Sequence, residues 1–308
     1  MSVICIYHDN CQDGFAAAWA VRHALGERVR FHAAHYGSVP PDVSPTDDVV
    51  IVDFSYPALV LQALALAARS VLVLDHHKTA QEALRDVTPA APVWDGDLVA
   101  LGLRGFCRPP LPNLTAVFDM ERSGAGLAWD WFHPGQPRPE PLNRVEDRDL
   151  GGGIGDNPAK YPDTSAVSAC LASHPMDFER WGYLMSMHPD DLAEEGKPIL
   201  RMERKRAQEL IANTGSTKVE IAGVTLPVAS APFHMASEVG ALLAQHSDEG
   251  RAATYFDTAR GRVWSLRSTR DGLPVDGIAK DMGGGGHARA AGFTIPWWAC
   301  TPAIKFHQ

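Results

Sequence analysis

Three short apolar runs without polar alternation divide the first 77 residues of the chain. The runs are Val3–Tyr7, Val49–Val52 and Val71–Leu74. Each is followed by a helix-prone stretch, and these stretches are Phe15–Leu25, Ala58–Ala68 and Thr79–Arg85. Strands that are apolar on both faces and alternate with helices are typical of a parallel sheet covered on both sides. The pattern predicts an N-terminal α/β domain.

The hydrophobic pattern changes from about Lys218, where shorter strands with partial alternation surround a helix predicted at Ala236–Gln245. The predicted strands are Lys218–Ile221, Thr225–Ala229, Ala252–Asp257 and Arg262–Arg267. Between the two regions, helices are predicted at Ala116–Phe132, Asp163–Ser173 and Leu192–Ala212. We therefore predict a catalytic domain over 1–190, a helical connector over 191–215 and a smaller α/β domain over 216–308, with a cleft between the domains.

Ionisable side chains follow all three N-terminal strands. His8 and Asp13 come after the first strand, Asp53 after the second, and Asp75-His76-His77 after the third. Ligands of open α/β sheets bind beyond the carboxyl ends of the strands, where these loops converge. Carboxylates collected there repel one another unless a cation compensates them. Mixed Asp and His ligands suit manganese, zinc or iron. A helix cap or a structural role is the better interpretation of each residue taken singly, but three strand ends with the same chemistry favour the metal site.

Composition and charge restrict the class of protein. Hydrophobic residues make up 45% of the 308 residues and the formal net charge is −9, which favours a small or short substrate over extended nucleic acid. The five cysteines are scattered and form no CxxC pair, which fits a reducing cytoplasm. No apolar run is long enough for a membrane span, and Val3–Tyr7 lacks the flanks of a signal peptide. We expect a cytoplasmic protein without membrane contact; the sequence does not decide the oligomeric state, a homodimer included.

The two ends of the chain together resemble a known family. Asp75-His76-His77 and Asp53 after apolar strands, with His8 and Asp13-Gly14 after the first, resemble the DHH phosphoesterases. The run Gly283–Gly286 with His287, followed by Ala290-Ala291-Gly292-Phe293, resembles the signature of the companion DHHA1 domain. Members of this family include single-strand exonucleases, oligoribonucleases and cyclic-dinucleotide phosphodiesterases. Because the two signatures occur in the expected order, the resemblance covers nearly the whole chain.

The resemblance implies a role for each matching residue. His8 and Asp13 would contribute to one metal site, Asp53 would bridge two metals and His76 would bind the second. Asp75 would orient its neighbours, and His77 would lie beside the scissile phosphate. The family also has a further Asp after the middle helices, for which we expect Asp147 rather than Asp149. A solvated charged turn is the alternative for that segment.

Cys11 departs from the family pattern. Most members place two Asp residues one apart after the His, whereas here Cys11 and Asp13 hold that spacing. Cys11 is a thiolate ligand, a small buried residue that packs the loop, or a sign that one metal site is weak or empty. We favour the packing role. The expected cofactor is Mn²⁺, in two divalent sites of which the second is in question.

The glycine run and nearby arginines suit phosphate. Glycines let successive backbone N–H groups approach an anion closely, and Arg267 could clamp a terminal phosphate in bidentate fashion. A flexible linker is the alternative for the glycine run. The residues expected to bind substrate are Arg267, Gly284, Gly285, Gly286, His287 and Arg289.

The sequence thus predicts a metal-dependent phosphoesterase. Two metals can acidify a bridging water and stabilise the attacking and leaving oxygens of an in-line displacement. The expected reaction is hydrolysis of short single-stranded oligonucleotides. Hydrolysis of a cyclic or linear dinucleotide, and a non-catalytic nucleotide-binding protein, remain the alternatives.

Overall fold

The computed structural model describes residues 2–84, 113–299 and 303–306. The chain forms two compact units. The first comprises Met1–Leu150 and Leu171–Leu192, and the second comprises Gly151–Cys170 and Ala193–Gln308. The domain divisions drawn from the sequence at residues 190 and 215 stay a prediction.

The first unit is built on a five-stranded parallel sheet of order β2-β1-β3-β4-β5. Its strands are β1 (Ser2–His8), β2 (Val29–Ala34), β3 (Asp47–Val52), β4 (Ser70–Asp75) and β5 (Leu114–Phe118). Every residue of β3 and β4 is buried, as expected for Val- and Leu-rich strands in the middle of a covered sheet. The α/β fold with an N-terminal parallel sheet is confirmed.

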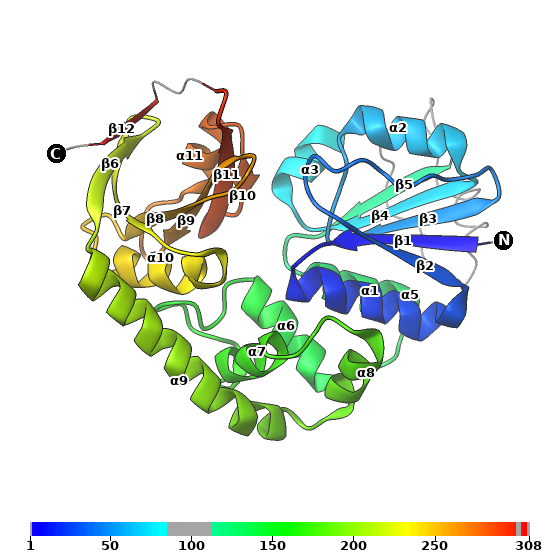
Figure 1. The fold of residues 1–308 in the computed structure, drawn as a ribbon. Coiled ribbons are helices and arrows are strands. Elements are labelled where there is room, and N and C mark those ends of the chain that lie inside the picture. The colour runs from blue at the N-terminus through cyan, green and yellow to red at the C-terminus, as the bar shows by residue number, and fades with distance from the viewer. Residues whose placement is uncertain (1, 85–112, 300–302, 307–308) are drawn as a thin grey trace. The chain divides into compact units, whose positions relative to one another are not determined.

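Helices cover both faces of this sheet. Helices α1 (Gln12–Leu25) and α5 (Gly124–Phe132) lie on one face, and α2 (Ala58–Ala67) and α3 (Lys78–Leu84) lie on the other (Figure 1). Helices α6 (Glu140–Asp149) and α8 (Phe178–Ser186) pack against α1. The sequence predicted one helix over 116–132, and this was wrong for its first half. The apolar run before the polar turn at 119–123 is strand β5, because it pairs with β4.

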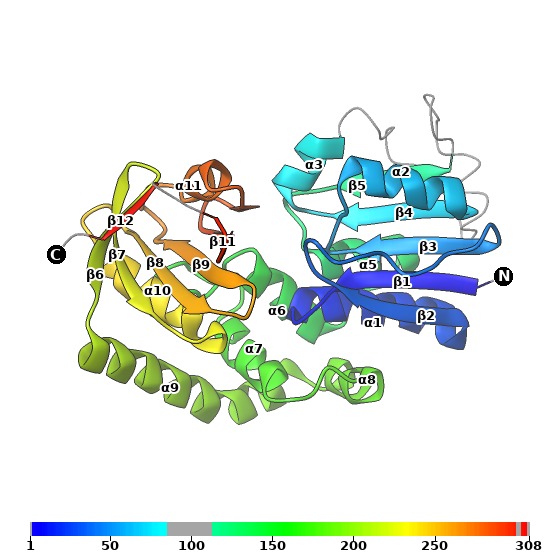
Figure 2. The ribbon, with the colours of Figure 1, turned by 45° about the horizontal axis from the view of Figure 1, so that its top comes forward.

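The second unit contains a mixed seven-stranded sheet of order β10-β11-β9-β8-β7-β6-β12 (Figure 2). Its strands are β6 (Thr217–Ile221), β7 (Val224–Ser230), β8 (Arg251–Asp257), β9 (Gly261–Ser268), β10 (Gly285–Gly286), β11 (Ala290–Pro296) and β12 (Ile304–Phe306). Among these only β7 and β8 pair in parallel.

Helices and a buried core complete the second unit. Its helical elements are η2 (Phe233–Met235), α10 (Ala236–Gln245) and α11 (Asp276–Asp281). Helix α7 (Thr164–Ala172) lies in this unit except for its last two residues, and helix α9 (Pro189–Thr214) lies in it except for its first four residues. Helix α10 packs on β7, β8 and β9, and the core between α11 and the sheet includes Trp264, Leu266 and Phe293. The second α/β domain is confirmed as a separate mixed sheet.

Candidate metal centre

The carboxyl ends of β1, β3 and β4 converge on one group of polar side chains in the first unit. His8 is the last residue of β1, Asp53 directly follows β3, and Asp75 is the last residue of β4. His76 and His77 begin the loop after β4. Because the three strands are parallel neighbours, these residues meet at the same edge of the sheet.

His76 lies at the middle of this group. Its side chain is 1% exposed, and its Nε2 atom lies 3.1 Å from Asp53 Oδ1, 3.4 Å from Asp149 Oδ2 and 3.9 Å from Asp13 Oδ2. Three carboxylates thus surround one imidazole nitrogen. We call Asp13, Asp53, His76 and Asp149 the carboxylate cluster.

Asp53 uses its two oxygens in two directions. Oδ1 faces His76, whereas Oδ2 lies 3.5 Å from His8 Nδ1. The backbone of Asp53 has a φ of 52°, a left-handed conformation that a non-glycine residue adopts only when its surroundings hold it there. Its N–H donates to Leu74 O at 3.0 Å. This backbone conformation places the Asp53 carboxylate between two groups of ligating atoms.

The carboxylate cluster brings three carboxyl groups around one histidine, and the pKa values of its acids are shifted. Burial and the neighbouring Asp149 and Asp53 raise the pKa of Asp13 well above its usual range. Burial likewise raises the pKa of Asp149 to about 6, although the nearby histidines oppose the shift. Burial opposes ionisation of Asp53 too, but His76 and His8 outweigh it and hold its pKa low.

The pKa of His76 responds to the same group of carboxylates. Burial would lower it, but the hydrogen bond that His76 donates to Asp53 and the charges of Asp149 and Asp13 raise it to about 10. His76 therefore carries a positive charge among the carboxylates. A bound metal cation would supply more positive charge at the same place.

His77 is oriented by Asp75. The two side chains meet at 2.7 Å between Nδ1 and Oδ1, and Asp75 Oδ1 also accepts the His76 and His77 N–H groups. Burial lowers the pKa of His77, but the Asp75 carboxylate outweighs this and raises it. This arrangement fits the expected orienting role of Asp75, a role that stays a prediction.

Asp149 occupies the place expected for Asp147. The Oδ2 atom of Asp149 lies with Asp13 and His76 in one possible metal-binding set, which does not include Asp147. Both residues belong to helix α6, where two positions correspond to a rotation of roughly 200°. The two side chains therefore point to nearly opposite sides. The geometry favours Asp149 for this place, and a metal-binding role for either residue stays a prediction.

The residues present fit divalent metal ions. Sets of ligand atoms that lie within 4.8 Å of one another are His8–Cys11–Asp53, Asp13–His76–Asp149 and Asp53–Asp75–His77. Oδ2 of Asp53 and Oδ2 of Asp75 are buried and accept no hydrogen bond within the described residues. Buried carboxylate oxygens without donors are costly unless a cation binds them. These buried Asp and His residues could hold divalent ions.

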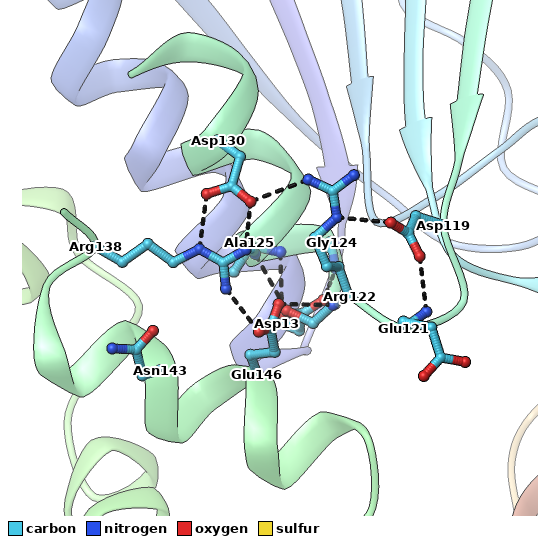
Figure 3. A network of polar contacts seen from close by, with 12 residues as sticks. Asp13, Asp119, Glu121, Arg122, Gly124, Ala125, Asp130, Arg138, Asn143 and Glu146 are labelled. Carbon is cyan, nitrogen blue, oxygen red and sulfur yellow. Dashed lines mark hydrogen bonds and ion pairs between the residues drawn. The ribbon is translucent and has the colours of Figure 1, made fainter. Parts of the chain in front are cut away.

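Helix α5 holds Asp13 from its N-terminus, and sequence reasoning missed this contact. The N–H groups of Gly124 and Ala125 donate to the two Asp13 oxygens at 2.6 and 3.1 Å (Figure 3). A side chain at Gly124 would collide with the Cβ atom of Asp53 and would lie 2.9 Å from Asp13 Oδ2. Glycine is required because the helix approaches the cluster this closely. Ser123, which caps the helix, was the available signal, since Ser is a preferred N-cap residue.

Two arginines form a second polar network along α5, from Ser123 at its N-terminus to Asp130 near its C-terminus, which we call the arginine network. Arg138 donates to Asp130 Oδ1 at 2.8 Å and to Glu146 Oε1 at 2.6 Å, and Arg122 donates to Asp130 Oδ2 at 3.0 Å (Figure 3). Glu146 Oε2 also accepts the Ser123 N–H at 3.1 Å. This network therefore links both ends of α5 to Arg138 and to Glu146 of α6.

The Tyr36 side chain is a further neighbour of the site that the sequence did not reveal. Its ring centroid lies 5.7 Å from that of His8, 5.3 Å from Phe54 and 6.2 Å from His77. Ser38 donates its N–H to His35 O, closing a turn that displays the exposed tyrosine. No polar motif marks such an aromatic residue in advance.

The glycine run of the second unit is shaped by strand packing. Gly285 pairs with Gly292 and Gly286 with Ala291, and a side chain at Gly284 would collide with the Gly292 carbonyl. Gly284 donates its N–H to Ala279 O, and His287 donates to Ala290 O. These two N–H groups serve the fold, so the expected phosphate cradle has fewer donors than the sequence implied.

The arginines expected to bind substrate already make contacts within the second unit. Arg289 Nη1 donates to the carbonyls of Thr269 and Gly272 at 2.7 and 2.6 Å, and thereby holds a turn. Arg267 Nη2 donates to Ser237 Oγ at 2.6 Å. A substrate-binding role for Arg267, Gly284, Gly285, Gly286, His287 and Arg289 stays a prediction.

Comparison with known proteins places few constraints on activity. No family model matches the sequence. The chain is 27% identical over 318 residues to uncharacterized protein R106 of Acanthamoeba polyphaga mimivirus, which covers 95% of this chain and 67% of the relative. Within the described residues, none of the helices has both the length and the apolar character to cross a bilayer.

Solved structures give only distant likenesses, each at 13% identity. An uncharacterized protein from Helicobacter pylori G27 matches 96% of this chain and 93% of its own at a TM-score of 0.39. A pGpG-specific phosphodiesterase, PggH, from Vibrio cholerae matches 96% and 93% at 0.42. An exopolyphosphatase-related protein from Bacteroides fragilis matches 97% and 87% at 0.41. At these TM-scores the likenesses carry no argument, so the functional conclusion rests on the site.

Proposed function

We propose that this chain is a metal-dependent phosphodiesterase of the DHH/DHHA1 type that hydrolyses short single-stranded oligonucleotides. The observation that supports it is the position of Asp53, whose two oxygens face His76 on one side and His8 on the other. A carboxylate in that position suits a bridge between two cations. The family resemblance of the motifs supplies the substrate class.

The protein residues divide the work of such a reaction. His8, Asp13, Asp53, His76 and Asp149 would hold two divalent ions, with Mn²⁺ as the proposed metal. Bound ions would supply positive charge to phosphate oxygens and lower the pKa of an attacking water. His77, kept in place by Asp75, would donate a hydrogen bond to the phosphate. The N–H groups of α5 keep Asp13 fixed while charge shifts nearby.

The test is release of mononucleotides from end-labelled RNA and DNA oligomers of two to five residues, with Mn²⁺ and then with chelator. We expect products only with metal, and their pattern gives length preference and polarity. If metal binds and no product forms, cyclic and linear dinucleotides are tested next. Failure there, with nucleotide still bound, would support the non-catalytic binding protein instead.

A further inference from the structure

Cys11 lies beside His8 and Asp53, two of the candidate metal ligands at the carboxyl ends of the strands. Its sulfur, a ring nitrogen of His8 and a carboxylate oxygen of Asp53 all lie within 4.8 Å of one another. His8 Nδ1 and Asp53 Oδ2 are 3.5 Å apart. Ligands around one tetrahedral zinc ion lie roughly 3.3–3.8 Å apart, as follows from metal–ligand distances of about 2.0–2.3 Å. The measured separation therefore fits a shared ion.

We propose that Cys11 is a metal ligand, so that one of the two metal sites is a mixed site of His8 nitrogen, Cys11 sulfur and Asp53 oxygen. This deepens the proposed function, on which it rests for the existence of a metal centre. It replaces the packing role that the sequence favoured for Cys11. The site would prefer zinc, or cobalt in its place, to manganese.

The contrast between the two ligand sets supports this metal preference. Asp13, His76 and Asp149 offer only oxygen and nitrogen, which suits manganese. The set that contains Cys11 adds a soft sulfur, and thiolate ligands select zinc over magnesium or manganese. Asp53 lies next to both ligand sets, because one of its oxygens faces His8 and the other faces His76. We therefore expect two different metals in one centre.

The surroundings of Cys11 explain why a metal is needed for this role. Cys11 is the residue directly before helix α1, and a helix N-terminus favours a thiolate. Burial and the carboxylates of Asp53, Asp149 and Asp13 act against it and raise the pKa of the thiol well above its usual range. A zinc or cobalt ion bound beside His8 and Asp53 would hold the sulfur as a thiolate and displace its proton.

Cobalt gives a direct readout of sulfur ligation. The metal-free protein is titrated with Co²⁺, and the sulfur-to-cobalt charge-transfer band in the near ultraviolet is recorded for wild type, Cys11→Ser and Cys11→Asp. Cys5→Ala is the matched control, because it also removes one thiol but lies within strand β1. We expect the band in wild type and in the control, and its loss in both Cys11 variants.

Metal affinity gives the second measurement. Zn²⁺ affinity should fall by at least about tenfold in Cys11→Ser, since even partners outside the ligand shell affect affinity by 10–100-fold. Cys11→Asp should bind Mn²⁺ in two equivalents. Protection of wild-type Cys11 from alkylation by Zn²⁺, mapped by mass spectrometry, needs no variant. Cobalt binding without the band, or unprotected Cys11 with zinc bound, would overturn the proposal.

Activity separates this proposal from the function on which it rests. Mn²⁺-dependent hydrolysis by Cys11→Asp, together with a missing cobalt band in wild type, would leave the phosphodiesterase standing and remove only the sulfur ligand. A clear band without hydrolysis of any oligonucleotide or dinucleotide would do the reverse.

Discussion

Two groups of acidic side chains involve helix α5, and they are neutralised in different ways. In the arginine network, Arg122 and Arg138 hold Asp130 and Glu146 with hydrogen bonds of 2.6–3.0 Å. In the carboxylate cluster, the ion-pair partners of Asp13, Asp53 and Asp149 within the described residues are histidines. The comparison teaches that neighbouring acidic residues can have different roles. Acids paired with arginine are neutralised within the protein, whereas acids beside histidines are candidate metal ligands.

The pKa shifts express the same difference. Burial raises the pKa of Asp130, but Arg138 and Arg122 outweigh it and lower the pKa overall. Burial raises the pKa of Asp149 to about 6, and the charges of the neighbouring histidines oppose this shift without outweighing it. A group that carries its own cations is complete without a ligand. The carboxylate cluster is not, and it is the one where metal should matter.

The largest expected effect comes from Asp53→Asn, which removes the charge between the two sets of ligands. We expect hydrolysis to fall by at least about 1,000-fold, equivalent to about 4 kcal/mol of transition-state stabilisation, and bound metal to fall from two equivalents. Asp130→Asn in the arginine network is the matched control and should keep both metal equivalents. Metal analysis and oligonucleotide turnover measure both. Near-normal turnover by Asp53→Asn with metal bound would contradict the bridging role.

The next largest effect should come from Gly124→Ala. Its methyl group would collide with Asp53 and crowd Asp13, so we expect a loss of about 1–3 kcal/mol of stability and weaker metal binding. Gly182→Ala within α8 is the control, because its nearest neighbour outside the helix would be Trp19 Nε1 at 3.6 Å, an ordinary contact. That variant should be stabilised by roughly 0.5–1 kcal/mol. Urea unfolding and metal titration compare the two, and equal behaviour would argue against close packing.

Replacing Arg138 with Met should act on stability more than on metal. Loss of the guanidinium leaves Asp130 and Glu146 without that partner, and we expect about 2 kcal/mol of destabilisation, somewhat less than for a fully buried pair. Zn²⁺ and Mn²⁺ stoichiometry should be kept at temperatures where the variant is folded. Calorimetry with and without metal measures both. Loss of both metals from the folded variant would show that the two groups are one functional unit.

The smallest effect is a pH dependence of the metal-free protein. The pKa of Asp149 is raised from its ordinary 3.8 to about 6, so between about pH 4 and about pH 6 the folded state holds a proton that the unfolded chain has released. Stability should therefore fall as pH rises through this window, by on the order of 2 kcal/mol.

Asp130 changes the stability with pH in the opposite direction, because its pKa is lowered in the folded state. Its contribution to the free energy of unfolding is present above its ordinary pKa and is lost on acidification. Urea unfolding in chelator measures the slope, and Asp149→Asn should flatten it. Mn²⁺ should remove the loss of stability at the upper end of the window, because it favours the ionised carboxylates. A rising slope in chelator would contradict the assignment of uncompensated charge.

The sequence predicted the parts of the fold that depend on local pattern. Strands β1, β3 and β4 and the strands β6 to β9 were predicted within one or two residues, because their apolar runs are bounded by polar turns. Strand β2 was missed because Arg30 and His32 interrupt its apolar pattern. Helix α6 was not among the predicted helices, and a charged turn was the alternative for its last residues, since its buried positions are few among many charged ones.

The candidate site was predictable where it follows strand ends. His8, Asp53, Asp75 and His76 meet as the alternation of strands and polar residues implied. Asp149 was not distinguishable from Asp147, because the choice depends on the rotation of α6 against the sheet. The N–H groups of Gly124 and Ala125 belong to the backbone, which no side-chain pattern reveals.

The division of the chain into units bears on how the protein is made. Helix α8 lies late in the sequence, yet Phe178 stacks on Phe15 at 4.8 Å and Trp181 meets the same ring at 5.1 Å. Residues 151–170, which belong to the other unit, leave the ribosome before α8 does. A nascent chain that has reached Leu150 already contains all five parallel strands and the carboxylate cluster. It does not yet contain Phe178 and Trp181, which pack on Phe15. We therefore expect the first unit to complete its folding during synthesis only after residue 192 has emerged.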